Sequence, residues 1–411
     1  MSFVPMEAIG ERGEFDASRQ RPIAEVEAGF TCFQDGDVLV AKITPCFENG
    51  KGAIACGLLG GIGFGTTELH VLRPSSDLDA RFLFYVTASH SLRTLGAASM
   101  YGAAGQQRVG DGFLRDYLVG LPQLDVQRRI AAYLDRKTAA IDGLIAKKER
   151  LIELLEEKRQ AAITQAVTKG LDPGVPMKQS GIGWLPVTPA HWAIARVKHE
   201  VVGMTSGSRG WSEYFAEEGA VFLQSGNLDR QLGLDLSAVQ HVKPPATAEV
   251  RRTAIAPGDV LICITGALTG NVGLVREPLG EAYVNQHLAL VRPRTSAIVP
   301  AFLTYALGSL AGQAQLAVAQ YGLKQGLGLA DVADVMLGVP PIAEQRLIVR
   351  TLDNALARST DAGARLQMSV GALREYRQAL ITAAVTGQID VANMADDRDD
   401  VVEKVEADGE T

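Results

Sequence analysis

Apolar and polar positions alternate with a helical period over two long stretches of the chain, residues 122–172 and 339–390. In each stretch, apolar side chains recur near the a and d positions of a heptad, which predicts two long helices with one apolar seam each. Gly143 and Gly363 interrupt the pattern at about 1 kcal/mol each relative to alanine, so a kink is predicted near each. The predicted seam comprises Ile130, Leu134, Ile141, Leu144, Leu151, Leu155 and Ala162, then Ile348, Leu352, Ala355, Ala362, Leu366, Leu373 and Leu380.

The two stretches are copies of one sequence. Residues 121–172 align without a gap with residues 339–390, and 19 of the 52 aligned positions are identical. A helix of some 45 residues is a rod of roughly 65 Å, and its apolar seam needs a partner, for which the other copy is the simplest choice. A coiled-coil spacer with no further role would show the same pattern. The identical pairs include Pro122/Pro340, Gln127/Gln345, Arg128/Arg346, Leu134/Leu352 and Asp135/Asp353.

The sequences that precede the two helices also match each other. Both contain a Gly-Asp-Val turn before a β-rich run, at residues 36–38 and 258–260. The chain is therefore a tandem duplication of one unit, a globular α/β domain followed by a long helix. We predict a strand at 117–121 and a Pro/Gly-rich linker from residue 173. The predicted domains are residues 1–121, the central helix 122–172, a second domain 173–338, the distal helix 339–390 and an acidic tail 391–411.

Charge is distributed unevenly along the chain. The formal net charge is −7, and residues 391–411 hold eight acidic against two basic residues, which indicates a disordered tail. The remaining chain is nearly neutral, while the stretch 126–172 holds ten basic against seven acidic residues. A near-neutral body can bind nucleic acid through local basic patches, but it lacks a strong non-specific attraction.

Several classes of protein are excluded by missing patterns. No run of 18 apolar residues and no signal peptide are present, and the four cysteines form no zinc-binding spacing, so we expect reduced thiols in a cytoplasmic protein. The sequence also lacks a phosphate-binding loop, a zinc-protease motif, a nucleophile elbow and the motif of amino-methyltransferases. His191 and His287 are predicted to be structural. The pattern favours a binding protein over an enzyme.

The helix ends carry the motifs P-x4-QRxI and [KY]RQAxIT, once in each copy. Together with the domain–helix–domain–helix order, these motifs resemble the specificity subunit of type I restriction–modification systems. Residues 183–192, GWLPVTPAHW, resemble the opening motif of a target-recognition domain in that family. The resemblance implies an α+β fold in which two target-recognition domains are joined by two long antiparallel coiled-coil helices with an internal pseudo-two-fold repeat.

The resemblance also implies a function without chemistry of its own. Each domain would read one half of a split double-stranded DNA site, and the length of the helices would fix the unread spacer. Modification subunits would dock on the helices and methylate adenine with S-adenosylmethionine, and a restriction subunit would use ATP and Mg for translocation and cleavage. No cofactor and no metal are expected on this chain.

Polar side chains on matching loops are candidates for DNA contact, since base edges and phosphates are read by amide, hydroxyl and basic groups. Each of them could equally be a solvated or turn-stabilising side chain. The candidates in the first domain are Lys42, Thr44, Gln106, Gln107 and Arg108. Those in the second are Ser206, Ser208, Arg209, Thr265, Thr269, Asn271, Lys324 and Gln325.

The first domain departs from the second in length. It begins near the equivalent of Val221 and has no counterpart of residues 183–192, so we expect either a misassigned start at Met1 or a shortened domain. A shortened domain leaves a second interpretation, a degenerate scaffold that binds modification subunits but does not read DNA. A stand-alone enzyme is a third and weaker interpretation.

Overall fold

The computed structural model describes residues 1–103, 105–207, 209–245, 248–320 and 326–391. These residues form two compact units of mixed α+β structure. The first unit combines Met1–Arg150 with the chain from Leu366 onward, and the second is Leu151–Arg365. The predicted acidic tail lies outside the described residues, except for its first residue. In the part of the chain that is described, no helix is both long and apolar enough to cross a membrane.

The first unit holds two small sheets, with strand orders β1-β5-β2 and β4-β3-β6. Its strands are β1 (Ser2–Val4), β2 (Thr31–Gln34), β3 (Val38–Ala41), β4 (Gly52–Ile54), β5 (Ile62–Gly65) and β6 (Leu69–Leu72). Its short helices are α1 (Ile23–Val26), α2 (Ala80–Ala88), α3 (His90–Ala98) and α4 (Asp111–Asp116). All four residues of β3 are buried, as expected for the β-rich run after the Gly-Asp-Val turn.

The second unit holds two four-stranded sheets, β10-β17-β14-β15 and β11-β13-β12-β16, and two strand pairs, β18-β9 and β7-β8. The first strands are β7 (Met177–Ile182), β8 (Leu185–Pro189), β9 (Ala193–Arg196), β10 (Val201–Ser206), β11 (Phe215–Ala216) and β12 (Ala220–Leu223). The later strands are β13 (Gln240–Val242), β14 (Val260–Cys263), β15 (Val272–Leu274), β16 (Ala282–Val284), β17 (Leu288–Pro293) and β18 (Met336–Val339). The short helices are α6 (Val197–Glu200), α7 (Ala248–Thr253), α8 (Pro300–Gly308), α9 (Leu310–Ala319) and α10 (Leu329–Ala333).

Strand pairing confirms the internal repeat. The antiparallel pair β3–β6 places Val38 opposite Leu72, and β14–β17 places Val260 opposite Val291. The parallel pair β1–β5 likewise repeats β12–β16. Among the described residues of the first unit, no strand takes the place of β9 or β10.

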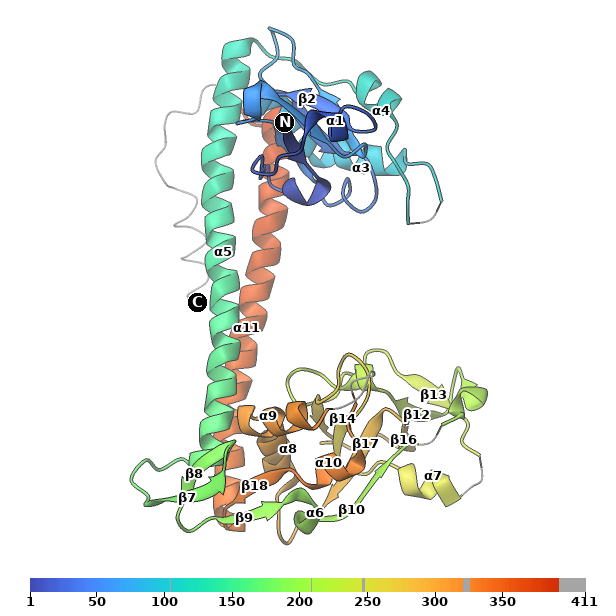
Figure 1. Cartoon of the computed structure of the whole chain (residues 1–411), viewed down its shortest axis with the longest axis vertical. Helices are drawn as coiled ribbons and strands as arrows, with labels where there is room; N and C mark the ends of the chain where they lie inside the picture. Colours follow the sequence, from blue (N-terminus) through green and yellow to red (C-terminus); the bar gives the residue numbers. More distant parts are fainter. Residues whose placement is uncertain (104, 208, 246–247, 321–325, 392–411) are drawn as a thin grey trace. The chain divides into compact units, whose positions relative to one another are not determined.

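Two long helices contribute to both units, α5 (Leu124–Lys169) and α11 (Ile342–Val385). Both remain helical through Gly143 and Gly363, and Figure 1 shows no sharp kink in either. In the first unit, Arg377 contacts Asp142 at 3.1 Å and Arg374 contacts Glu149 at 2.7 Å. Residue numbers rise along one helix as they fall along the other, so the helices run antiparallel. In the second unit, Gly170, just past α5, lies against Glu344 in the first turn of α11.

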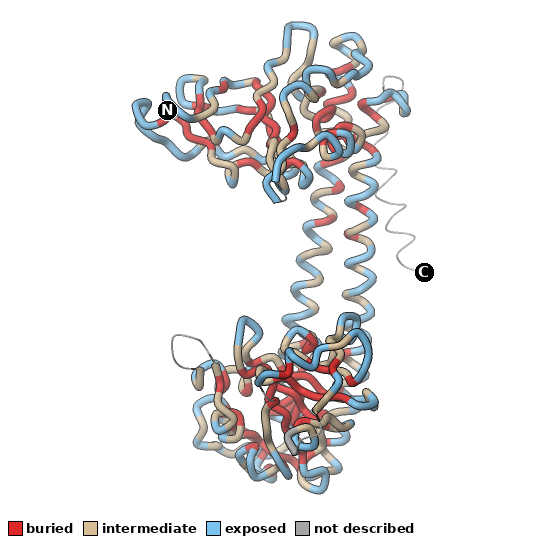
Figure 2. Tube along the Cα trace, turned by 90° about the vertical axis from the view of Figure 1, so that its right-hand side faces the viewer, coloured by how far each residue is buried: buried red, intermediate tan, exposed pale blue. Residues whose placement is uncertain are grey.

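The predicted heptad seam is buried or half-buried at all of its positions except Leu151. Ile130 and Leu134 of α5 are buried, as are Leu373 and Leu380 of α11, but Leu151 is 49% exposed. Figure 2 shows many buried residues where each long helix meets the domain of its own unit, and few near the middle of the helix. The seam prediction is therefore wrong at Leu151, whereas the neighbouring seam positions Leu144 and Leu155 are half-buried.

One buried glutamine anchors each domain to the start of a long helix. In the first unit, Gln127 accepts from the N–H of Asp79 at 2.8 Å and donates to the carbonyls of Asp77 and Pro122 at 2.9 and 2.8 Å. Gln345 makes the same three bonds in the second unit, to Val299, Ala297 and Pro340. Both side chains have no exposed surface. These contacts explain why the repeat retains this glutamine.

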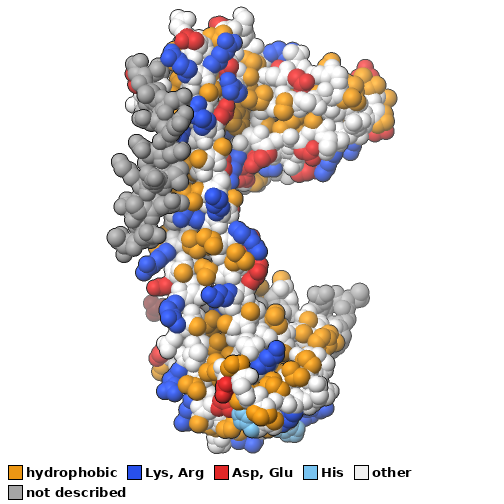
Figure 3. Space-filling view, turned by 90° about the vertical axis from the view of Figure 1, so that its left-hand side faces the viewer, with side chains coloured by type: hydrophobic (Ala, Val, Ile, Leu, Met, Phe, Trp, Pro, Cys, Tyr) orange, Lys and Arg blue, Asp and Glu red, His pale blue; other side chains and the backbone are white. Residues whose placement is uncertain are grey.

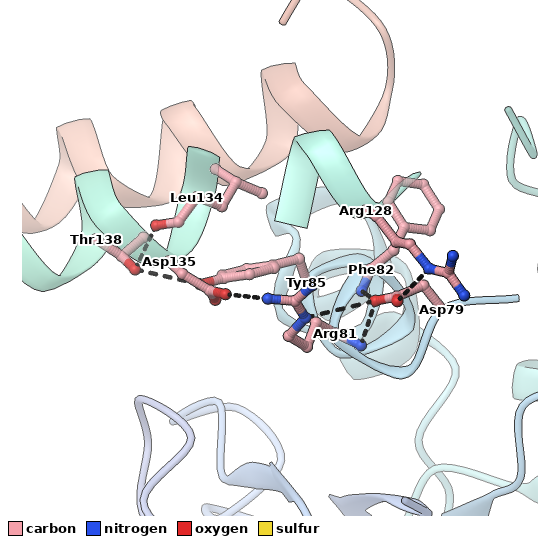
Figure 4. A network of polar contacts seen from close by, with 8 residues as sticks. All are labelled: Asp79, Arg81, Phe82, Tyr85, Arg128, Leu134, Asp135 and Thr138. Atoms are coloured by element: carbon pink, nitrogen blue, oxygen red, sulfur yellow. Dashed lines mark hydrogen bonds and ion pairs between the residues drawn. The ribbon is translucent and has the colours of Figure 1, made fainter. Parts of the chain in front are cut away.

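A tyrosine–aspartate contact forms a second anchor, shown for the first unit in Figure 4. The hydroxyl of Tyr85 on α2 donates to Asp135 on α5 at 2.8 Å, and Arg81 contacts the same carboxylate at 3.1 Å. In the second unit, Tyr305 donates to Asp353 at 2.5 Å, and Arg276 lies 3.2 Å from it. The tyrosine–aspartate pair is thus repeated, while the arginine comes from a different element in each unit.

The [KY]RQAxIT motif forms a third anchor at the other end of each long helix. Gln378 donates to the carbonyl of Ala88, and Thr382 accepts from the N–H of His90. The equivalent Gln160 and Thr164 make the same contacts in the second unit, with Gly308 and Leu310. The residues that the two copies share therefore hold each domain on its helices.

Two local predictions were wrong. Residues 117–121 form no strand, because no neighbouring strand pairs with them in the described part of the first unit. The predicted linker after residue 173 instead contains the hairpin β7–β8, in which Met177 lies opposite Pro189. Alternating half-buried positions along β7 were obscured in the sequence by its glycine and serine residues.

Candidate nucleic-acid interface

In the first domain, the structure brings all five candidate residues together. The loop after β3 carries Lys42 and Thr44, and the segment 101–109 carries the other three. The N–H of Thr44 donates to the carbonyl of Gln107 at 2.9 Å, and the N–H of Gln107 donates to the Thr44 hydroxyl at 3.1 Å. The N–H of Val109 also donates to the carbonyl of Lys42 at 2.9 Å. The two loops therefore form one surface at the end of β3.

The side chains on this surface differ in availability. Gln106 is exposed, and Lys42, Thr44 and Gln107 are half-buried. Arg108 makes a two-pronged contact with Glu68, with both distances at 2.9 Å, and this contact lowers the pKa of the Glu68 carboxyl. Arg108 must leave Glu68, or share it, before it can contact a base or phosphate.

The second domain repeats the backbone arrangement. The N–H of Leu327 donates to the carbonyl of Ile264 at 2.8 Å, and Thr265 forms an isolated bridge with Gly326. These contacts correspond to those of Val109 with Lys42 in the first domain. Lys324 and Gln325 lie in the matching loop but outside the described residues.

Three candidates follow β14 in the second domain. The Thr265 hydroxyl contacts Nδ1 of His287, which precedes β17. The Thr269 hydroxyl donates to the carbonyl of Gly266 at 2.6 Å and so stabilises its own turn. Asn271 is half-buried, and its backbone carbonyl accepts from Cys263. Both hydroxyls therefore already have a partner within the domain, that of Thr265 on a side chain and that of Thr269 on its own turn.

The remaining candidates lie at the end of β10. Ser206 is opposite Ala289 of β17, which is opposite Ile262 of β14, so Ser206 and Thr265 share one end of this sheet. Arg209 is exposed and precedes Gly210, whose φ of 85° continues the turn. Ser208 lies outside the described residues.

The arrangement suits binding of a polar ligand. Hydroxyl, amide and basic groups project from paired loops at equivalent sheet ends, which is the composition that contacts base edges and phosphates. Among the described residues, no group of three or more His, Cys, Asp or Glu side chains could hold a metal ion.

Comparison with known proteins gives a consistent group of relatives. No protein-family model matches the chain. Over 148 residues it is 43% identical to the type I restriction enzyme EcoEI specificity subunit of Escherichia coli, a match that covers 35% of this chain and 25% of that protein. Over 286 residues it is 24% identical to the EcoBI specificity subunit of Escherichia coli, covering 67% and 59%. The chain thus spans about a quarter of the length of the EcoEI specificity subunit.

Solved structures agree on the fold. One solved structure, described as showing complex assembly and conformational transition of the type I R-M system, contains a chain with a similar fold. The TM-score is 0.72 at 20% identity, and the match covers 94% of this protein and 92% of that chain. The chain is a relative of type I restriction specificity subunits. The HsdS subunit from Thermoanaerobacter tengcongensis has a TM-score of 0.51 at 20% identity, covering 94% and 90%. The α+β fold with long helices and an internal repeat is thereby confirmed.

For this relative of the type I specificity subunits, sequence reasoning missed two residues that face the candidates. Glu68 and His287 occupy equivalent places, directly before β6 and β17, and each contacts a candidate in its own domain. The repeat shows that the two positions are equivalent, but the sequence does not show their contacts. Arg108 is 40 positions from Glu68, and Thr265 is 22 positions from His287.

Two basic residues beside Ser206 were also missed. Arg251 and Arg252 are exposed on α7, and Arg252 donates to the Ser206 carbonyl at 3.2 Å. The consecutive arginines at 251–252 were the available signal. They add positive charge to the end of the sheet that carries Ser206 and Thr265.

Proposed function

We propose that the chain is the DNA-binding specificity subunit of a type I restriction–modification complex and that each of its two domains recognises one half of a bipartite target. The observation that carries this proposal is the repeated pair of polar loops. In each domain, the loop after the central strand meets a second loop, through the equivalent bonds Val109–Lys42 and Leu327–Ile264. Two similar reading surfaces in one chain fit a target with two parts.

The repeated anchors support the same function. A surface that reads bases must be held rigidly, because a displaced donor loses its partner on the base edge. The Gln127 and Gln345 contacts, together with the two tyrosine–aspartate pairs, hold each domain on the helices within its own unit. Helices held in this way are suited to set the number of unread base pairs.

We propose that methyltransferase subunits, and with them a restriction subunit, dock on the long helices. Leu151 and Leu154 of α5 are exposed apolar residues, as is Met368 of α11. Figure 3 shows apolar and basic side chains interspersed along the visible helix surface. Exposed apolar residues among charges are typical of a protein-binding surface. On this proposal the chain is non-catalytic, and S-adenosylmethionine, ATP and Mg bind to the partners.

The test is a methylation map. The chain is co-expressed with its modification subunits, and methylated adenines in host DNA are sequenced. The expected result is one bipartite motif. Substituting Gln106 and Lys42 with alanine should change or relax one half of the motif, and substituting Thr265 and Asn271 should affect only the other half. Each lost specific contact should weaken discrimination by about 1–3 kcal/mol.

Substituting the exposed residue Glu27 with alanine provides the control, since it follows α1 and lies outside both loop pairs and both long helices. This change should leave the motif unaltered. Methylation with no shared motif, or loss of the same half-motif from both sets of loop substitutions, contradicts the proposed division of recognition. Retention of the modification subunits without any sequence preference would identify a scaffold.

A further inference from the structure

A buried arginine, Arg93 of α3, supports the loop that joins β3 to β4 in the first domain. Its guanidinium donates to the carbonyl of Phe47 at 2.9 Å and to the carbonyl of Gly50 at 3.2 Å. It also lies over the Phe47 ring, 4.8 Å from the ring centroid, and the residue is only 8% exposed. Arg93 therefore holds loop 42–51, which carries two of the candidate DNA-contacting residues, from the inside of the domain.

The repeat places a neutral residue at the equivalent position of the second domain. Gln313 of α9 matches Arg93 at an offset of 220, and Gly270 matches Gly50 at the same offset. The Gln313 amide donates to the carbonyl of Gly270 at 3.0 Å and to the carbonyl of Leu307 at 2.9 Å. Both glycines have a positive φ, 84° at Gly50 and 96° at Gly270. Because glutamine supports the matching loop without a charge, the charge of Arg93 is not needed for support.

The positive charge of Arg93 has no acid beside it. Among the described residues, no carboxylate forms an ion pair with its guanidinium, and its buried Nε has no hydrogen-bond partner. Burial lowers the pKa of Arg93 to about 10, so the side chain is still charged at neutral pH. A buried charge without a counter-charge is costly, and an anion bound over the loop would offset that cost.

The loop in front of Arg93 is basic as well. Residues 42–51 contain two lysines and one acid, Glu48, so with Arg93 the site has three basic groups against one acid, a net formal charge of +2. The matching loop 264–271 and Gln313 contain no charged residue. The second domain has its nearby basic residues on α7 instead. The two domains therefore differ in charge at equivalent loops, although these loops are supported alike.

We propose that loop 42–51, with Arg93 behind it, binds a backbone phosphate of DNA, and that the matching loop of the second domain binds none. The inference rests on the proposed DNA recognition and adds Arg93 to the residues that serve it. A phosphate supplies the negative charge that Arg93 lacks. Because Arg93 is buried, its attraction is weakened less by water than that of an exposed arginine. Phosphate contacts position a protein on DNA without reading its sequence, so this site strengthens binding and leaves base recognition to the other loop residues.

Two substitutions at position 93 separate the charge from the hydrogen bonds. Arg93→Gln introduces the residue that the second domain uses, so it removes the charge and keeps an amide donor for the loop. Arg93→Lys keeps the charge. The full chain is titrated into fluorescent duplex DNA of random sequence near 0.05 M salt, and anisotropy is measured. We expect Arg93→Gln to raise the Kd about fivefold and Arg93→Lys to change it less than about twofold, with the difference narrowing as salt is added.

Arg19→Gln is the matched control for net charge. Arg19 is an exposed arginine of the same domain that pairs with Glu7 at 3.1 Å and lies outside loop 42–51. Its loss should change the Kd less than about twofold, because exposed charges are screened. Equal effects of Arg19→Gln and Arg93→Gln would show that only net charge matters and overturn the proposal. Equal weakening by Arg93→Lys and Arg93→Gln would show that the charge is not the cause and overturn it too.

A surface variant tests the same site without changing the interior of the domain. Glu48 is exposed on loop 42–51, so Glu48→Gln should not affect folding. Removing this acid should lower the Kd for random duplex DNA about twofold or more, because the phosphate then meets no like charge on the loop. An unchanged or higher Kd would overturn the proposal even if both variants of Arg93 failed to fold.

A methylation map of Arg93→Gln separates this inference from the proposed function. Since a phosphate carries no sequence information, the variant should methylate the same bipartite motif as the unmodified chain, but to a lower extent. A changed half of the motif would show that Arg93 positions base-reading residues, which overturns the phosphate site and leaves the proposed function intact. If the unmodified chain gives no motif at all, the proposed function fails, whereas the random-duplex measurements still decide whether the loop binds phosphate.

Discussion

At the scale of single residues, the identical positions of the repeat proved to be anchors. Gln127 and Asp135 were recognisable from the sequence as residues shared with the second copy, where they match Gln345 and Asp353. In the structure each contacts the residue equivalent to the one its counterpart contacts. The candidate readers Lys42 and Gln106 are not shared between the domains. This difference fits two domains that are held alike and read different bases.

Gln127→Leu should destabilise the first unit strongly. The substitution leaves one buried N–H and two buried carbonyls without their glutamine partner, so we expect a loss of about 2–4 kcal/mol in the free energy of unfolding. Urea unfolding followed by circular dichroism measures the loss. The control is Gln123→Leu, in the same region but exposed, which should change stability by less than about 0.5 kcal/mol. Equal effects of the two substitutions would contradict the anchoring role.

Tyr305→Phe should alter stability in alkaline solution. Burial and the Asp353 carboxylate raise the pKa of Tyr305 to about 12, against a usual value near 10. The folded chain then holds this proton more tightly than the unfolded chain, so its stabilising contribution is complete below about pH 10 and is lost as the pH rises toward about 12. Urea unfolding across this range should show a shallower decline for Tyr305→Phe than for the unmodified chain. Tyr214→Phe, at an exposed tyrosine, should reproduce the unmodified slope.

At the scale of elements, the sequence allowed the two long helices and the central strands to be predicted, because their periodicity is strong and their caps are recognisable. It did not allow the fate of residues 117–121 to be predicted. Their sequence resembles that of β18, but a strand forms only where a partner strand is present, and β9 is that partner in the second unit alone. The seam at Leu151 failed for a related reason, since burial depends on what covers the helix.

A matched pair of glycines tests this account of the strands. Gly338→Ala should lower the free energy of unfolding by about 1–3 kcal/mol, because the new Cβ would lie 2.9 Å from the buried Trp192 ring and 3.0 Å from the Thr188 hydroxyl. Gly120→Ala should have an effect below about 0.5 kcal/mol, since nothing lies within 4 Å. Differential scanning calorimetry of both variants measures the contrast. A larger loss at Gly120 than at Gly338 would be incompatible with the packing described.

At the scale of the whole molecule, the duplicated plan and the equivalence of the loops in the two domains were predictable, because the two halves of the chain align with each other. That the two loops within each domain meet was not predicted. The contacts of Arg108 with Glu68 and of Thr265 with His287 were not, since they join side chains from separate strands. Charge could be read from the sequence directly. Residues 392–411 contain eight acidic and two basic residues, which accounts for most of the net charge of −7.

Removing residues 392–411 should strengthen non-specific DNA binding. The shortened chain has a net charge of about −1, so it repels phosphate less, and we expect a several-fold lower Kd for random duplex DNA near 0.05 M salt. Fluorescence anisotropy over a salt series should show the difference vanish near about 0.5 M salt. A chain whose eight tail acids and two tail bases are all replaced by Asn and Gln has the same net charge as the shortened chain and should match it. A tail of the same charge in scrambled order should match the full chain, and failure of either match would show that charge is not the cause.

The first unit is assembled from both ends of the polypeptide, since residues 1–150 share it with the chain from residue 366 onward, whereas residues 151–365 form an uninterrupted second unit. On the ribosome, the middle of the protein therefore has all of its parts before the beginning does. The N-terminal domain, although translated first, must wait for the last helix to emerge before Gln378 and Thr382 can reach Ala88 and His90. A released chain that ends at residue 365 should resist protease in its middle and be cleaved readily in its first hundred residues, the reverse of the usual order in which domains mature during synthesis.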